Sequence, residues 1–170
     1  MTILEYAVFL IFPLVMIYAA ISDLTTMTIS NTVSLILLGA FFIAAPLLPG
    51  MNIETFGLHL AAGATVLIGG FALFSFGWIG GGDAKIAAAG ALWLGFGHTI
   101  EYMVWTALLG GVLTLLILRA RRRFLPEFAM RREWIARLHE PSGGVPYGIA
   151  LGAAALLIYP QTSWIALAGG

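Results

Sequence analysis

Two aspartates, Asp23 and Asp83, are the residues of this chain whose type and placement suggest chemistry. They are the only aspartates among its 170 residues. Asp23 closes the first apolar run, and Asp83 follows a glycine-rich interruption between two later apolar runs. An ionisable residue beside a membrane segment predicts function, although either acid alone would equally fit a helix cap or an interfacial residue. The two together favour one active site.

A pair of carboxyl groups can hydrolyse an amide bond with the help of water. One ionised carboxylate accepts a proton from water as the base, while its protonated partner donates a hydrogen bond to the scissile carbonyl. Two charges about 4 Å apart repel by roughly 4 kcal/mol at an effective dielectric of about 20, so the pair retains one proton between them. We therefore predict that Asp23 and Asp83 are catalytic.

The composition predicts an all-α polytopic membrane protein, in which both acids lie at the ends of apolar segments. Hydrophobic residues make up 61% of the chain and charged residues 9%. Several apolar runs approach the ~20 residues that cross a bilayer. No Lys or Arg precedes the first run, which favours a retained helix over a signal peptide. We expect one transmembrane domain, residues 1–170, with about six helices near 3–22, 33–48, 56–76, 84–96, 102–118 and 146–166.

Basic residues are concentrated in one polar segment, 119–144. Seven of the eight Lys and Arg residues lie there, and short basic loops stay on the cytoplasmic side of a membrane. With six crossings, this loop, Asp23 and Asp83 share the cytoplasmic side, and both termini lie outside. This parity was not used to choose the segments, so it supports a shared site independently.

The second half of the basic loop has helical periodicity. If a helix starts at Pro126, one arc of it carries the apolar residues, and the basic residues lie largely opposite. This pattern is typical of a helix on the membrane surface, so we expect contact with lipid headgroups. The apolar residues of this arc are Phe128, Met130, Trp134, Ile135 and Leu138.

The residues around Asp83 predict its local backbone. Gly80, Gly81 and Gly82 either form a flexible linker or take positive φ and let an extended substrate approach. Lys85 is either an interfacial anchor or a positive charge beside Asp83. Ala84, Ala87, Ala88 and Ala91 have the spacing of one helix face on which another helix packs closely. A turn is expected at 97–99.

Other protease and metal chemistries have weaker support. The chain has no cysteine, no His-Glu-x-x-His and no Gly-x-Ser-x-Gly, which argues against thiolate, zinc and serine-elbow sites. A Ser75–Lys85 dyad is disfavoured because Ser75 falls inside a predicted helix. The last group, His59, His98, Glu54 and Glu101, is predicted near the outer face with a spacing that matches no closed metal site.

The motifs resemble those of type IV prepilin peptidases, which are membrane aspartyl proteases. The stretch from Gly80 to Lys85 fits the G-x-G-D-x-K motif of that family. The stretch from Asp23 to Asn31 is similar to the family's first aspartate motif, with Ile29-Ser30-Asn31 where the family has Ile-Pro-Asn. Val145-Pro146-Tyr147-Gly148 looks like the start of the family's last helix. The resemblance covers nearly the whole chain and is closest to short members associated with tight-adherence (Flp) pili.

The resemblance implies the activity, the substrate and the site. It implies that Asp23 and Asp83 cleave the short basic leader of a prepilin at the cytoplasmic border of the inner membrane, without cofactor, metal or nucleic acid. The supporting residues are Gly80, Gly82, Lys85 and Asn31. Longer relatives also N-methylate the new terminus and carry a cysteine-based zinc region, which this cysteine-free chain lacks. Two alternatives are a proton- or cation-coupled transporter and a non-catalytic subunit of a pilus machine.

Overall fold

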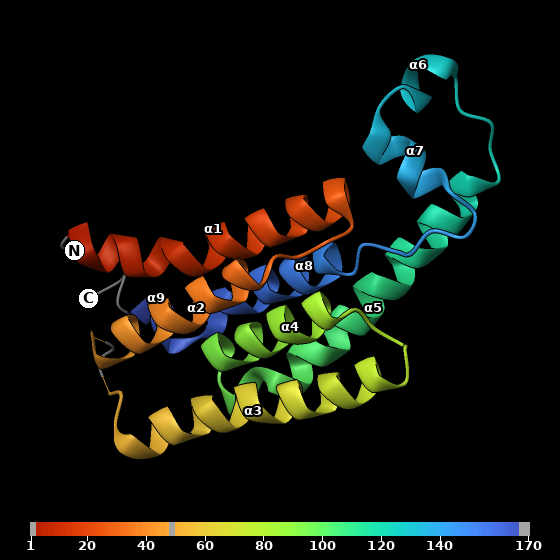
Figure 1. Ribbon diagram of the computed structural model, residues 1–170. Helices are drawn as coiled ribbons and strands as arrows, with labels where there is room; N and C mark the ends of the chain where they lie inside the picture. Colours follow the sequence, from red (N-terminus) through yellow and green to blue (C-terminus); the bar gives the residue numbers. More distant parts are fainter. Residues whose placement is uncertain (1–2, 48–49, 167–170) are drawn as a thin grey trace.

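The computed structural model describes residues 3–47 and 50–166, and every regular element in these ranges is helical (Figure 1). Six longer helices form a bundle, and short helices extend or connect them. The elements are α1 (Ile3–Thr26), α2 (Asn31–Ala44), η1 (Ala45–Leu47), α3 (Ile53–Ser75), α4 (Gly81–Leu94), α5 (Phe96–Arg121), α6 (Glu127–Met130), α7 (Glu133–His139), α8 (Gly148–Ile158), η2 (Tyr159–Gln161) and α9 (Ser163–Ala166).

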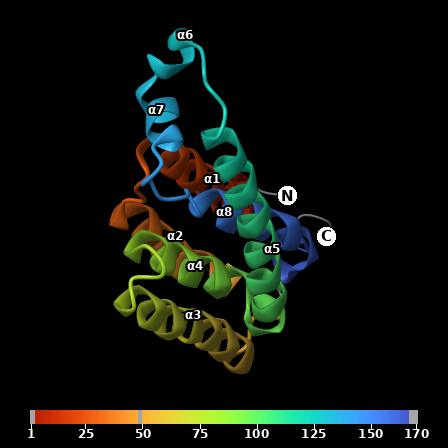
Figure 2. The same ribbon diagram turned by 90° about the vertical axis from the view of Figure 1, so that its right-hand side faces the viewer.

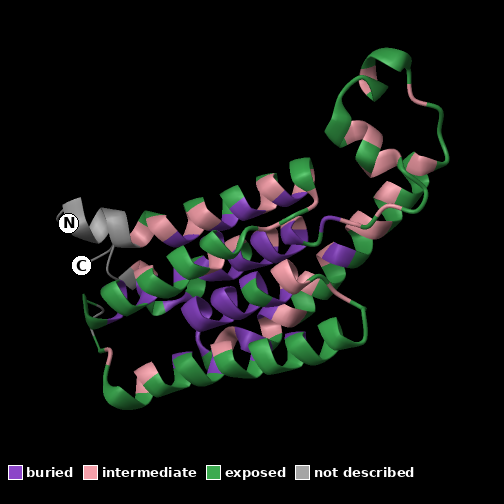
Figure 3. Cartoon of the chain, in the orientation of Figure 1, coloured by how far each residue is buried: buried purple, intermediate pink, exposed green. Residues whose placement is uncertain are grey.

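Helices α4 and α8 lie inside the bundle, and the longer helices surround them (Figures 1 and 2). All residues of α4 from Ile86 to Leu94 are buried, whereas α3 and α5 are mostly exposed (Figure 3). The predicted small-residue face of α4 is confirmed. A Cβ on Gly70 of α3 would lie 3.0 Å from the Cβ of Ala84, so the two helices approach at van der Waals distance.

Three of the described helices, α1, α3 and α5, are long and apolar enough to cross a membrane. Two shorter apolar helices are formed by α2 with η1 and by α8 with η2. Helices α2 and α4 have 14 residues each and α8 has 11. The prediction of about six crossings is therefore confirmed only as far as three long helices, and the other three predicted crossings correspond to shorter helices.

Two predicted helix boundaries are wrong. α1 does not end at Asp23 but continues to Thr26, because Met27 takes a left-handed conformation (φ 56°) and donates its N–H to Asp23 O at 2.8 Å. The predicted turn at 97–99 lies at Gly95, whose φ of 83° needs glycine. α5 therefore begins at Phe96.

The glycines before Asp83 form neither a linker nor a positive-φ loop. Gly80 is the extended N-cap of α4 (φ −72°, ψ 145°), and Gly81 and Gly82 are already helical. The chain reverses earlier, at Gly77, with a φ of 73°. Asp83 is consequently the third residue of a helix rather than a loop residue.

The basic segment folds into a protruding hairpin, residues 122–143, which we call the basic hairpin (Figure 1). Pro126 precedes α6, as predicted, but the helix stops after one turn because Arg132 is extended (φ −86°, ψ 113°) and starts α7. The single continuous surface helix of the prediction is therefore two short helices. Phe124 and Phe128 are exposed on it.

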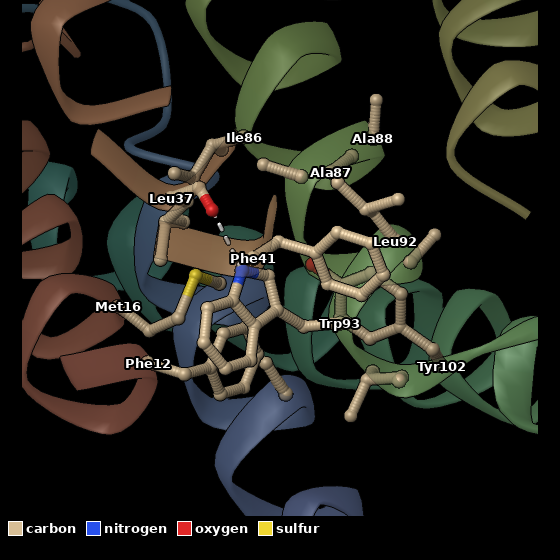
Figure 4. Close-up of a cluster of buried hydrophobic side chains, with 14 of the residues drawn as sticks. Phe12, Met16, Leu37, Phe41, Ile86, Ala87, Ala88, Leu92, Trp93 and Tyr102 are labelled. Atoms are coloured by element: carbon tan, nitrogen blue, oxygen red, sulfur yellow. Dashed lines mark hydrogen bonds between the residues drawn. The ribbon is translucent and has the colours of Figure 1, made fainter. Parts of the chain in front are cut away.

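Aromatic side chains fill the bundle at the end of α4 that is far from Asp83 (Figure 4). The ring of Trp93 stacks on Phe12, with centroids 5.3 Å apart, and lies 4.5 Å from Trp164. Trp93 Nε1 donates to Leu37 O at 2.9 Å, so its polar atom is paired inside the core. We call Phe12, Phe41, Trp93, Tyr159 and Trp164 the aromatic core.

Candidate active site

Asp23 lies in the last turn of α1 with its side chain inside the protein. The residue is 5% exposed, and its Oδ2 accepts a hydrogen bond from the backbone N–H of Gly148 at 2.7 Å. Gly148 is the first residue of α8, so the carboxylate also faces the positive end of a helix dipole. A Cβ on Gly148 would lie 2.9 Å from the Cβ of Asp23, so this contact requires glycine.

Asp83 lies in the first turn of α4 and is half-buried. Its carboxyl group turns back toward the N-cap residue, Gly80. A negative charge there is stabilised by the helix N-terminus. A Cβ on Gly80 would lie 2.9 Å from Asp83 Oδ2. Gly80 therefore makes room for the carboxyl group.

Ile29 lies between the stretch that contains Asp83 and the residue that is hydrogen-bonded to Asp23. A Cβ on Gly82, beside Asp83, would lie 3.2 Å from the Cβ of Ile29, and one on Gly148 would lie 2.9 Å from its Cδ1. Gly82 and Gly148 thus both approach Ile29 closely. The structure brings the two acids to one place.

Each acid is held by backbone rather than by the other acid. The hydrogen bonds of the described residues include none between the two carboxyl groups. Asp23 has one backbone N–H donor, and an ionised carboxylate has lone pairs that can accept further hydrogen bonds. A water molecule can donate to these lone pairs, and a protonated member of the pair can donate its O–H to an acceptor.

Asn31 and Lys85, both predicted to support the site, form a hydrogen bond. Lys85 Nζ donates to Asn31 Oδ1 at 2.7 Å. Asn31 is the first residue of α2, capped by Ser30, whose Oγ accepts the N–H of Thr32 at 3.2 Å. The bond joins the stretch that follows Asp23 to the helix that carries Asp83. Both side chains are exposed, so the lysine also faces solvent or lipid headgroups.

An apolar groove begins beside this hydrogen bond and runs along α2, α3 and α4. Its volume is about 530 Å³. Asn31 and Lys85 line its polar end, and leucines and small residues line the rest: Leu35, Leu38, Leu60, Gly63, Ala64, Leu67, Ala88, Ala89 and Leu92, with Ser34. Lys85, two residues after Asp83, is thus at the edge of a surface that accommodates nonpolar groups.

The competing sites do not assemble. Ser75 Oγ donates to Ala72 O at 2.7 Å, while Lys85 is bonded to Asn31, so these two residues form no dyad. His59 is buried with Nδ1 2.7 Å from Leu92 O, and His98 lies 3.7 Å from Glu101. No group of three or more metal-binding side chains occurs in the part of the chain that the structure describes.

Gly148 and Ile29 are the site residues that reasoning from single residues missed. Neither carries a reactive group, and Gly148 is 125 positions from the acid that it contacts. The available signal was the pair of motifs that contain them, Val145-Pro146-Tyr147-Gly148 and Ile29-Ser30-Asn31. These motifs supply backbone contacts rather than chemistry.

Comparison with protein families gives one match. The model of the type IV leader peptidase family matches residues 10–115, which is more than half of the chain and includes both aspartates. A search of curated proteins found no match, and neither did a search of solved structures.

Proposed function

The chain belongs to the type IV leader peptidase family, and we propose that it is an intramembrane aspartyl endopeptidase with Asp23 and Asp83 as its catalytic pair. The observation that carries this proposal is the meeting of the two acids around Ile29. Each acid lies at a helix end: Asp23 accepts the N–H of Gly148 at the start of α8, and Asp83 lies against Gly80 at the start of α4.

The proposed mechanism follows the ordinary chemistry of a carboxyl pair. The ionised member takes a proton from water, whose oxygen attacks the carbonyl carbon of the scissile peptide bond. The protonated member donates to the carbonyl oxygen. When the C–N bond breaks, the member that took the proton from water gives it to the departing amine, and the other member takes a hydroxyl proton from the tetrahedral intermediate. The pair then holds one proton again, as at the start. The backbone N–H groups stabilise the negative charge of the pair throughout the cycle.

We propose that the substrate is a prepilin of the Flp type, cut at the cytoplasmic border of the inner membrane. The acids and the basic hairpin lie at the same end of the bundle: Arg137 Nη1 of the hairpin is 3.4 Å from Thr25 O, two residues after Asp23. A basic loop favours the cytoplasmic side, so both termini are expected outside. A leader peptide in the cytoplasm, followed by an apolar helix, places its cleavage site at this depth. The proposal concerns cleavage alone and does not extend to N-methylation.

The test is co-expression of a Flp-type prepilin with the wild type, Asp23→Asn and Asp83→Asn. Asparagine keeps the size and polarity of the side chain but cannot exchange the proton. Both variants are expected to insert into the membrane and to leave the precursor uncut. Glu54→Gln serves as the matched control, because Glu54 is an exposed acid in the first turn of α3.

The outcomes separate the competing functions. Cleavage by either aspartate variant at near the wild-type rate would exclude the paired-acid mechanism. Loss of ion flux with intact cleavage would indicate transport instead. A pilus that assembles normally with both variants would indicate a non-catalytic subunit.

A further inference from the structure

Arg121, the last residue of α5, differs from the other arginines of the basic segment in its surroundings. The other six are exposed, whereas Arg121 is half-buried. Its Nε donates to Leu138 O at 2.7 Å, and its Nη2 donates to Gly144 O at 2.8 Å. A guanidinium group holds its donors in a fixed plane, so these two carbonyl groups are held at a fixed separation.

Gly144 belongs to a short segment whose position depends on such contacts. Residues 143–146 have no regular secondary structure. The segment is packed around the guanidinium group, since a Cβ on Gly143 would lie 3.2 Å from Arg121 Nη2. At its far end, Pro146 is fully buried and the ring of Tyr147 lies against Gly110 of α5. α5 therefore holds the segment at both ends.

The residue that follows this segment is the hydrogen-bond donor to Asp23. Gly148 N–H lies 2.7 Å from Asp23 Oδ2, only four residues after the carbonyl that Arg121 holds. The surroundings of Gly148 leave no room for adjustment, because an added Cβ would meet both Asp23 and Ile29 at 2.9 Å. A shift of the 143–147 segment must therefore move the N–H that orients Asp23.

We propose that Arg121 is a positioning residue for the peptidase reaction, acting on Asp23 through the 143–147 segment and the N–H of Gly148. This inference rests on the proposed function, since it concerns how Asp23 is oriented for catalysis. Arg121 itself contacts neither carboxyl group. Its role is to fix the backbone that does.

The first test compares Arg121→Gln and Arg121→Lys with Arg122→Gln, which removes the exposed neighbouring charge. The three variants and the wild type are reconstituted in vesicles of one lipid composition, and kcat and KM are measured on a purified prepilin. We expect Arg121→Gln to lower kcat about tenfold with KM within about twofold, because misplacement of a catalytic group affects the chemical step. Arg121→Lys should lower kcat nearly as much as Arg121→Gln, because the ammonium group of lysine lacks the planar donors that hold two carbonyl groups at once. Arg122→Gln should behave as the wild type.

A double variant tests whether the effect passes through Gly148. Gly148→Ala alone should lower kcat strongly, because its methyl group displaces the contact with Asp23. If Arg121 acts through that contact, Arg121→Gln combined with Gly148→Ala should be no slower than Gly148→Ala alone. Multiplication of the two single effects would show that Arg121 acts elsewhere, and would overturn the proposal.

Hydrogen–deuterium exchange supplies a readout that does not depend on activity. Arg121→Gln should speed the exchange of backbone amides in 143–151, and Arg122→Gln should not. Unchanged exchange in Arg121→Gln would overturn the positioning role whatever the activity. If the wild type itself fails to cut any prepilin, the proposed function fails. If the wild type cuts and Arg121→Gln cuts equally fast, only the present inference fails.

Discussion

At the end of the bundle far from the acids, large aromatic side chains fill the interior, whereas at the acid end glycines bring backbone into direct contact. Trp93 and Trp164 are fully buried, and each indole N–H is paired with a backbone carbonyl. At the acid end, a Cβ on Gly148 would lie 2.9 Å from both Asp23 and Ile29, and a Cβ on Gly82 would lie 3.2 Å from Ile29.

This difference separates stability from activity. The burial of apolar area stabilises a fold in proportion to that area, and the aromatic core contains the largest buried side chains. The close contacts of glycine backbone with Asp23 and Ile29 bury little area, but they fix the positions of the atoms accurately. We therefore expect substitutions at the aromatic end to unfold the protein and substitutions at the acid end to inactivate a folded one.

The largest expected effect is that of Trp93→Ala on stability. Trp93 is 0% exposed, and its removal leaves a cavity and an unpaired carbonyl at Leu37. We expect the free energy of unfolding to fall by about 3–5 kcal/mol. Thermal unfolding in detergent measures this, with Trp105→Ala, a half-exposed tryptophan on α5, as the control. A folded Trp93→Ala fraction that cuts prepilin many times more slowly than the wild type would break the separation between the two ends.

Gly148→Ala should have the opposite signature. An added methyl group meets Asp23 and Ile29 at 2.9 Å and displaces the N–H donor. We expect about a 100-fold loss of kcat, equivalent to about 2.7 kcal/mol of transition-state stabilisation, with a small change in melting temperature. Gly111→Ala is the matched control, because a Cβ there has nothing within 4 Å. If Gly148→Ala unfolds instead, Gly148 contributes mainly to stability, and the proposed difference between the two ends is wrong.

The smallest expected effect is that of the hydrogen bond between Lys85 and Asn31. Both side chains are exposed, so solvent weakens the bond. In a cycle of Asn31→Ala, Lys85→Met and the double variant, we expect a coupling of about 1 kcal/mol, or about fivefold in kcat/KM. Additive effects would show that the two residues act separately and that this bond does not join the two acid-bearing stretches.

The sequence predicts the approximate helices and the end of the bundle at which the acids meet, because both follow from local patterns. Long apolar runs mark α1, α3 and α5, and the basic segment, predicted to share a side with both acids, lies at the same end of the bundle as Asp23. Ser and Asn side chains after Asp23 predict the start of α2 within a residue or two, and Ser30 is its cap.

The remaining details depend on contacts between residues that are distant in sequence. Glycine has a low helix propensity, which favoured a loop at 80–82, yet the Asp83 cap and contact with Phe74 on α3 start the helix at Gly81. The contact of Gly148 with Asp23 joins residues 125 positions apart, and the periodicity of the sequence does not predict such a contact. The helix breaks at Arg132, although residues with a high helix propensity precede it, so local propensity did not predict the break.

The short inner helices have a consequence for the supply of water. A helix of 14 residues, such as α4, rises about 21 Å, whereas the hydrocarbon of a bilayer is about 30 Å thick. Because α4 lies inside the bundle, neighbouring helices rather than lipid surround it, so its length does not have to match the bilayer. Asp83 lies in the first turn of α4, and Asp23 is bonded to the first residue of the still shorter α8. The proposed hydrolysis therefore requires that water reach both carboxyl groups at the ends of these two short inner helices.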